Sequence, residues 1–120
     1  PVRVRTDEES LRRVMLIVLD NALKYTTPST EPGKGRVMVS VERKEREAVL
    51  HISDTGIGIE FAELPHIFER FYRADRARSR QGTGLGLSIA KTLVEQLGGH
   101  ITAQSTPGQG STFSIWLPLA

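Results

Sequence analysis

Apolar residues recur at helical spacing near the start of the chain. They fall three, four and seven positions apart, at Leu11, Val14, Met15, Val18, Leu19 and Ala22. This spacing predicts an α-helix with one buried face. Asp7 is suited to cap the helix, and the acidic residues of the first turn suit the helix dipole. The helix should end near Thr26, because residues 28–35 are rich in proline and glycine.

Further along, apolar and polar residues alternate with a period of two, which is typical of β-strands. Residues 36–41 and 48–52 are predicted to form one hairpin around a charged turn at residues 42–47. A second hairpin is predicted near the C-terminus, around a turn at residues 107–110. Its buried face would consist of Ile101, Ala103, Phe113, Ile115 and Leu117.

The segment between the hairpins starts with weak periodicity and ends in a second helical pattern. An irregular stretch as long as residues 60–81 suggests a lid or binding loop, with Phe68 and Phe71 as its anchors. Residues 64–72 alternatively form a short amphipathic helix within it. The helical pattern that follows ends at Gly98. Its apolar positions are Ile89, Ala90, Leu93, Val94 and Leu97.

Helix, hairpin, lid, helix and hairpin therefore follow one another. This order predicts an α/β fold, a two-layer α/β sandwich with a mixed, mostly antiparallel sheet and helices on one face. A ligand would lie between the helical layer and the lid. At 120 residues with 38% hydrophobic content, residues 1–120 are expected to form a single domain.

Composition narrows the class of protein. There is no cysteine, which excludes disulfides and thiol chemistry, and no apolar run as long as a membrane span, so we expect a soluble, cytoplasmic location. Net charge is only +2, but five arginines within residues 70–80 suggest an anionic partner. A solvated loop is one alternative, and a nucleic-acid surface is another. Only 6% of the residues are aromatic and no nucleic-acid-binding motif is present, which argues against the second.

A carboxylate followed by two glycines stands at the end of one predicted strand. Asp54 could accept a hydrogen bond from an exocyclic amine, while Gly56 and Gly58 could let the backbone approach a flat purine. The same Asp-x-Gly-x-Gly pattern is also a common strand-to-loop turn, in which Asp bonds to its own backbone. Taken alone, the motif leaves both interpretations open.

A polar cluster lies off the apolar face of the first predicted helix. Asn21 and Tyr25 are one turn apart, and Lys24 flanks them. An amide oxygen can bind Mg²⁺, an ammonium group can meet a phosphate, and a tyrosine ring can cover a base. An ordinary exposed helix end is the alternative.

Glycines also alternate at the start of the second predicted helix, from Gly82 to Leu87. Glycines there expose backbone N–H groups at the positive end of the helix dipole, which suits a phosphate. The spacing is neither that of the Rossmann fingerprint nor that of a P-loop. Tight packing of the helix is the structural alternative.

Taken together, these stretches resemble the five sequence boxes of the catalytic ATP-binding domain of sensor histidine kinases. In chain order they are residues 21–26, 54–59, 67–73, 82–87 and 108–113, so the likeness covers nearly the whole chain. That family is part of the superfamily of DNA gyrase B, HSP90-type chaperones and MutL. The resemblance therefore implies the Bergerat fold with an ATP lid.

The resemblance implies roles at the base of a bound nucleotide. Asp54 would receive the adenine amine, helped by a water that Ser111 holds. Gly56 and Gly58 would leave room for the base, and Ile59 would line the site.

It also implies roles at the phosphates. Asn21 would be the Mg²⁺ ligand, and Lys24 and Arg73 would neutralise phosphate oxygens. Tyr25 would pack near the nucleotide. The γ-phosphoryl group of ATP would pass to a histidine on a separate dimerisation domain. A response regulator would be the downstream partner, and the parent protein would be cytoplasmic or membrane-anchored. Backbone donors around the phosphates would come from Gly82, Thr83, Gly84, Leu85, Gly86 and Leu87.

The chain departs from the family's pattern at two points. Ile17 stands one turn before Asn21, where the family usually has a polar residue, so a contact that supports Mg²⁺ is missing. None of His51, His66 and His100 has the flanking residues of the family's phosphoacceptor. We therefore expect the chain to bind Mg²⁺-ATP without phosphorylating itself. The resemblance also implies a monomer, because dimerisation in this family comes from a separate helical segment. ATP-hydrolysing clamps such as DNA gyrase B and HSP90-type chaperones use a glutamate one turn before the asparagine to activate water, and Ile17 cannot act as such a base. The alternative to a kinase domain is a catalytically idle nucleotide-binding or interaction module.

Overall fold

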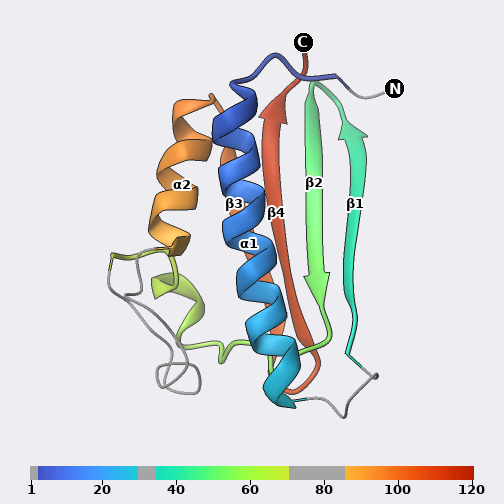
Figure 1. Cartoon of the computed structure of the whole chain (residues 1–120), viewed down its shortest axis with the longest axis vertical. Helices are drawn as coiled ribbons and strands as arrows, with labels where there is room; N and C mark the ends of the chain where they lie inside the picture. The colour runs from blue at the N-terminus through green and yellow to red at the C-terminus, as the bar shows by residue number, and fades with distance from the viewer. Residues whose placement is uncertain (1–2, 30–34, 71–85) are drawn as a thin grey trace.

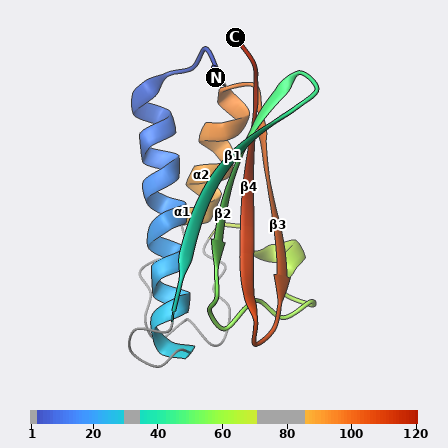
Figure 2. The same cartoon turned by 90° about the vertical axis from the view of Figure 1, so that its right-hand side faces the viewer.

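The computed structural model describes residues 3–29, 35–70 and 86–120, which form two layers (Figure 1). Helices α1 (Glu8–Ser29) and α2 (Gly86–Gln96) pack on one face of a four-stranded sheet. Seen from the side, both helices lie on the same side of the strands (Figure 2). The predicted α/β sandwich with helices on one face is therefore confirmed. The strands are β1 (Val37–Lys44), β2 (Glu47–Asp54), β3 (His100–Thr106) and β4 (Gly110–Pro118).

The sheet joins the two predicted hairpins through their second strands. Its order is β1-β2-β4-β3, and each neighbouring pair is antiparallel. The first hairpin turn is shorter than predicted, because Lys44 pairs with Glu47 and leaves only Glu45 and Arg46 between the strands. Charged residues 42–44 extend β1, because this edge strand is exposed along nearly its whole length and can carry charge on both faces.

Helix α1 begins where its sequence predicts. The backbone N–H of Ser10 donates to Asp7 Oδ2 at 3.1 Å, and the Ser10 hydroxyl donates to the same oxygen. These bonds, the hydroxyl bond first, hold the pKa of Asp7 below its usual range. The helix continues past the predicted end at Thr26 to Ser29, because a proline in the last turn removes one hydrogen bond without unwinding the turns before it. Of the helices in the part of the chain that the structure describes, none is long and apolar enough to cross a membrane.

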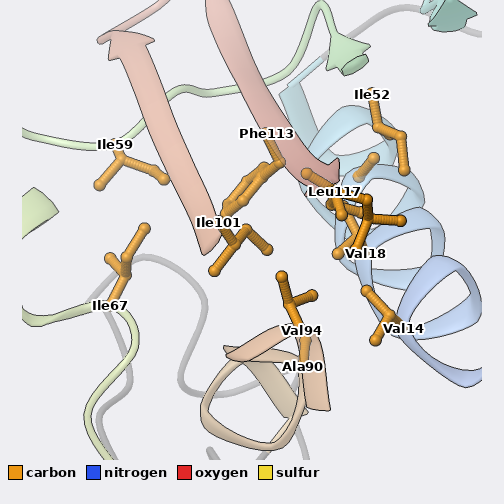
Figure 3. Packing of buried hydrophobic residues seen from close by; sticks show 12 residues of the cluster. Val14, Val18, Ile52, Ile59, Ile67, Ala90, Val94, Ile101, Phe113 and Leu117 are labelled. Carbon is orange, nitrogen blue, oxygen red and sulfur yellow. The ribbon is translucent and has the colours of Figure 1, made fainter. Parts of the chain in front are cut away.

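The core fills the space between the helices and the inner face of the sheet (Figure 3). Phe113 of β4 is fully buried, and Phe68 meets its ring edge-on at a centroid distance of 6.1 Å. Phe68 thus anchors the start of the predicted lid, whereas Phe71 lies outside the described residues. The helix suggested at residues 64–72 is reduced, within residues 60–70, to the 3-10 turn η1 (Leu64–His66). The buried cluster consists of Val14, Val18, Ala22, Ile52, Ile59, Ile67, Ala90, Val94, Ile101, Phe113, Ile115 and Leu117.

Candidate functional site

Asp54 is the last residue of β2, a central strand of the sheet. It pairs with Val37 of β1 on one side and with Ser111 of β4 on the other. It shares the inner face of the sheet with Ile52, two residues earlier, and is only 5% exposed. The fold therefore buries a carboxylate at one end of the layer that packs against α1.

The two carboxylate oxygens of Asp54 have different surroundings. Oδ1 accepts the backbone N–H of Gly56 at 2.8 Å, which is the local turn that the motif predicts. Oδ2 is buried and has no hydrogen-bond partner among residues 3–29, 35–70 and 86–120. Burial raises the pKa of Asp54, and the backbone hydrogen bonds from Gly56 and Ser111 only partly oppose this. The turn interpretation of the motif is therefore confirmed at Oδ1. Oδ2 is left as an unused acceptor, and its role toward a purine stays a prediction.

Asn21 has a similar unsatisfied group. Its side-chain Nδ2 is buried and has no partner. A buried polar atom without a partner costs about 1–3 kcal/mol, so such atoms are rare in folded proteins. Within the described ranges only three side-chain atoms are in this state, and the third belongs to Thr6, ahead of α1. Two of the three thus belong to residues that the sequence assigns to the ligand site.

Ser111, predicted to hold a water beside the base, is 4% exposed and bonds to a residue that the sequence analysis missed. Ser105 of β3 lies with its Oγ 2.9 Å from Ser111 Oγ. The same oxygen accepts the backbone N–H of Ile59 at 2.6 Å and donates to the carbonyl of Gly110 at 2.9 Å. A signal was present, because Ser105 continues the inward-facing series of Ile101 and Ala103 with a polar residue.

The loop after Asp54 is tied to the turn between β3 and β4. The backbone N–H of Gly108 donates to the carbonyl of Ile57 at 2.7 Å. Gly58 has φ of 73°, and a Cβ there would lie 2.3 Å from the carbonyl oxygen of Thr106. Gly58 is therefore required by the packing of the loop itself, in addition to the space predicted for a base. Next to it, the side chain of Ile59 lies in the core cluster.

The structure describes only part of the predicted phosphate end. Arg73, Thr83 and the rest of residues 82–85 lie outside the described residues, as do the side chains of Lys24 and Tyr25. Gly86 is the exposed first residue of α2, and Leu87 packs against the core. The position that usually carries a polar residue has a packing role here, since Ile17 Cγ2 lies 3.5 Å from where a Cβ on Gly86 would be.

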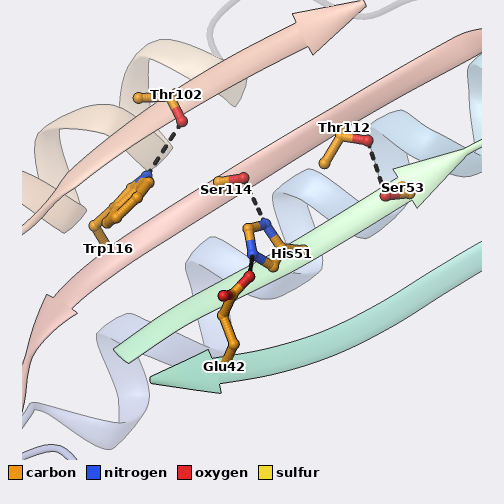
Figure 4. A network of polar contacts seen from close by, with 7 residues as sticks. All are labelled: Glu42, His51, Ser53, Thr102, Thr112, Ser114 and Trp116. Carbon is orange, nitrogen blue, oxygen red and sulfur yellow. Dashed lines mark hydrogen bonds and ion pairs between the residues drawn. The ribbon is translucent and has the colours of Figure 1, made fainter. Parts of the chain in front are cut away.

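The three histidines are placed away from this site or at the surface. His51 lies on the outer face of the sheet, where Nε2 is 2.6 Å from Glu42 Oε2 and Nδ1 is 2.7 Å from Ser114 Oγ (Figure 4). His66 Nδ1 is 2.8 Å from Glu69 Oε2. The ring of His100 stacks on Trp116 at 5.1 Å.

Comparison with known proteins agrees with the resemblance in the sequence. The family model described as histidine kinase-, DNA gyrase B-, and HSP90-like ATPase matches residues 6–120. Relatives include the circadian input-output histidine kinase CikA of Synechococcus elongatus, 45% identical over 116 residues, and the sensor histidine kinase YkoH of Bacillus subtilis, 42% identical over 114 residues. The matches cover 95% and 93% of this chain but 15% and 24% of those proteins. The chain thus spans less than a quarter of the length of these two relatives.

Solved structures of sensor kinases share the fold. The mycobacterial sensor histidine kinase MprB superposes with a TM-score of 0.84 and 39% identity, over 97% of this chain and 76% of that one. Full-length ShkA in complex with AMPPNP superposes with a TM-score of 0.79 and 30% identity, over 95% of this chain and 22% of that one.

Proposed function

The chain belongs to the family of histidine kinase-, DNA gyrase B- and HSP90-like ATPases, and from that premise we propose that it is the ATP-binding catalytic domain of a sensor histidine kinase. The observation that carries the proposal is the buried acceptor Asp54 Oδ2, together with the buried polar atom of Asn21. Both atoms lack partners within the described residues, and both belong to residues expected to hold a nucleotide. The complex of ShkA with AMPPNP, an ATP analogue, supports the same ligand class.

At the base end, Asp54 would recognise adenine. While the carboxylate is ionised, its free oxygen Oδ2 has no hydrogen to donate and acts only as an acceptor. Such an acceptor matches the N–H donors of an exocyclic amine. The bond would be strong, because a charged acceptor in a buried setting gains more than one in water. Ser111, on the neighbouring strand and the same face, would assist it.

At the phosphate end, the amide of Asn21 would face the metal and phosphates. The amide group can turn either its oxygen or its nitrogen toward a neighbour, so it fits a hard cation or a phosphate oxygen equally well. Mg²⁺, when bound, would neutralise charge on the phosphate oxygens. The start of α2 at Gly86, with the residues before it, would supply backbone donors. Lys24, Tyr25 and Arg73 are proposed to complete the site.

The proposed reaction transfers the γ-phosphoryl group of ATP to a histidine on a separate dimerisation domain of the same parent protein. A response regulator would then be the downstream partner, and the domain would work in the cytoplasm as a monomer. The two ring nitrogens of His51 are both engaged in hydrogen bonds, which argues against His51 as the phosphoacceptor. A catalytically idle nucleotide-binding module is the second candidate, favoured by the apolar Ile17 packed beside α2.

A label-transfer experiment separates these two functions. The domain is incubated with Mg²⁺ and γ-labelled ATP, with and without the histidine-bearing helical domain of the parent protein. A kinase domain gives acid-labile label on the helical domain and none on itself. If ADP binds but the helical domain stays unlabelled, the idle module is the correct account. Label on His51, His66 or His100 would contradict the assignment of the acceptor.

A further inference from the structure

Ser105 forms hydrogen bonds with three separate groups around the proposed base site. Its Oγ accepts the N–H of Ile59 at 2.6 Å, donates to the carbonyl of Gly110 at 2.9 Å, and lies 2.9 Å from the hydroxyl of Ser111. These partners come from the loop after Asp54 and from the start of β4. One side chain therefore links the two segments that frame the carboxylate.

The number of hydrogens determines the direction of the bond between the two serines. A hydroxyl has one hydrogen to donate and two lone pairs. A backbone carbonyl can only accept, so the hydrogen of Ser105 is used at Gly110. The remaining lone pair of Ser105 then faces Ser111, and the contact is attractive only if Ser111 donates its hydrogen to Ser105. Ser111 consequently has only lone pairs left for any other neighbour.

Ser111 offers those lone pairs beside Asp54. The two residues are direct partners in the register of β2 and β4 and share the inner face of the sheet, which brings their Cβ atoms to about 5 Å. They are 4% and 5% exposed, so water competes little with a bound group. Two acceptors, Asp54 Oδ2 and the Ser111 oxygen, therefore stand together with no donor from either side chain.

We propose that Ser105 determines the base specificity of this site by fixing Ser111 as a hydrogen-bond acceptor. A purine that presents an amino group at position 6 then meets two acceptors, whereas a purine with a 6-oxo group brings a third acceptor into the same place. The inference rests on the proposed nucleotide-binding function. Ser105 is a positioning residue, because it acts through Ser111 and is not assigned a contact with the nucleotide.

The test compares ADP with inosine diphosphate, which carries a 6-oxo group in place of the 6-amino group. Dissociation constants for both are measured by calorimetry for the wild type, Ser105→Ala, Ser105→Thr and Ser111→Ala. Ser53→Ala is the matched control, because it removes a similar bond between hydroxyls, 2.9 Å from Thr112 Oγ1, on the outer face of the same sheet.

Ser105→Ala frees the hydroxyl of Ser111 to donate to a 6-oxo group. We expect the preference for ADP over inosine diphosphate to fall by about fivefold, the factor typical of one net hydrogen bond. Ser111→Ala should reduce the preference as well, while Ser105→Thr, which keeps the hydroxyl, and Ser53→Ala should preserve it. A purely structural role would instead weaken both nucleotides by the same factor and leave their ratio unchanged, and that result would overturn the inference.

Two further readouts keep the outcomes distinct. If Ser105→Ala does not fold, Ser111→Ala still tests the proposal. An unchanged ratio of the dissociation constants for ADP and inosine diphosphate in Ser111→Ala would contradict the role of the Ser111 hydroxyl as an acceptor. Amide hydrogen exchange of Ile59 in the nucleotide-free protein should be slow and become faster in Ser105→Ala; unchanged exchange would overturn the hydrogen-bond arrangement. A different result is that the wild type binds neither ADP nor inosine diphosphate while Ile59 still exchanges faster in Ser105→Ala than in the wild type. That result would refute the proposed nucleotide-binding function, and with it the specificity role of Ser105.

Discussion

On the outer face of the sheet, away from the helices, polar side chains bond to one another, whereas on the helix side of the sheet two buried polar atoms lack a partner within the described residues. The outer face carries the chain Glu42, His51 and Ser114, with contacts of 2.6 and 2.7 Å. The inner side carries Asp54 Oδ2 and Asn21 Nδ2 without partners. Serines lie on both faces, so residue type alone does not distinguish them.

The difference separates polar groups that serve the fold from polar groups available to a ligand. An outer-face network satisfies itself, as in Ser53 with Thr112 at 2.9 Å and Trp116 Nε1 with Thr102 at 3.2 Å. A buried acceptor with a raised pKa does the opposite, since it costs stability until a donor arrives. Of the three buried polar atoms without a partner in the described residues, two belong to the candidate site.

The largest expected effect comes from breaking the support of the inner loop. Gly58→Ala should lower the free energy of unfolding by about 2–4 kcal/mol, because the new methyl group meets the Thr106 carbonyl and φ is positive. Thermal unfolding followed by circular dichroism measures this. Gly108→Ala is the matched control: φ there is 80°, but nothing lies within 4 Å of the added Cβ. Its cost should stay near 1 kcal/mol, that of the backbone conformation alone. Equal losses in the two variants would show that the close approach at Gly58 is unimportant.

The next effect is the pH dependence of nucleotide affinity. Protonated Asp54 cannot accept an amine hydrogen bond at the oxygen that carries the proton, so ADP affinity should fall as pH drops through the pKa of Asp54. Burial raises the pKa of Asp54, so ADP affinity should begin to fall at a pH above the range in which an ordinary aspartate titrates. At pH values below the raised pKa, the affinity should fall by about tenfold per pH unit. Calorimetric titrations across pH measure the slope, and the Asp54→Asn variant corrects for ionisation of the nucleotide itself. If ADP affinity changed with pH by the same slope in the wild type and in Asp54→Asn, Asp54 would not be the group whose ionisation controls binding.

The smallest effect concerns the outer face. His51→Ala removes two hydrogen bonds and should cost about 1–2 kcal/mol of stability while leaving ADP affinity within about twofold. Chemical denaturation and nucleotide titration of the same sample measure both. Arg12→Ala breaks only the exposed ion pair with Glu8, 3.6 Å apart, and should change neither quantity. Loss of nucleotide affinity in His51→Ala would mean that the two faces are coupled.

Local periodicity predicts much of this fold because each element has one buried face. The inward residues of α1 and of the second hairpin follow from spacings of three to four and of two. The predicted charged turn at residues 42–47 is confirmed at Glu45 and Arg46, but residues 42–44 and 47 belong to the strands, since charge marks solvent exposure and not the length of a turn. The central pairing of β2 with β4 joins residues far apart in the chain, and no local pattern contains it.

In the candidate site, too, local motifs predict some residues, while others depend on contacts between distant parts of the chain. Asp54 was predicted from its own motif, because a carboxylate followed by two glycines suits a flat ligand. Ser111 was expected only from the resemblance to the family. Ser105 was missed because its importance arises from three contacts made across strands. The packing demand on Gly58 was also missed, because Gly58 lies in the loop after β2 and the cause is the backbone of Thr106 at the end of β3.

The buried carboxylate of Asp54 destabilises the fold and is available to bind a ligand. Because its pKa is raised, the unfolded chain loses this proton first as pH rises, so the free energy of unfolding falls between the ordinary aspartate pKa and the raised one. Asn at this position keeps the acceptor for the Gly56 N–H and carries no charge. Stability and affinity should therefore change in opposite directions.

The measurement that tests this most directly is a paired one on Asp54→Asn at neutral pH, with Ser53→Ala alongside: the melting temperature without nucleotide, and the affinity for ADP with Mg²⁺. We expect Asp54→Asn to have a melting temperature equal to or above that of the wild type and an affinity about 100-fold weaker, with Ser53→Ala close to the wild type in affinity. An Asp54→Asn variant that binds ADP as tightly as the wild type, or one that melts several degrees lower, would contradict this expectation.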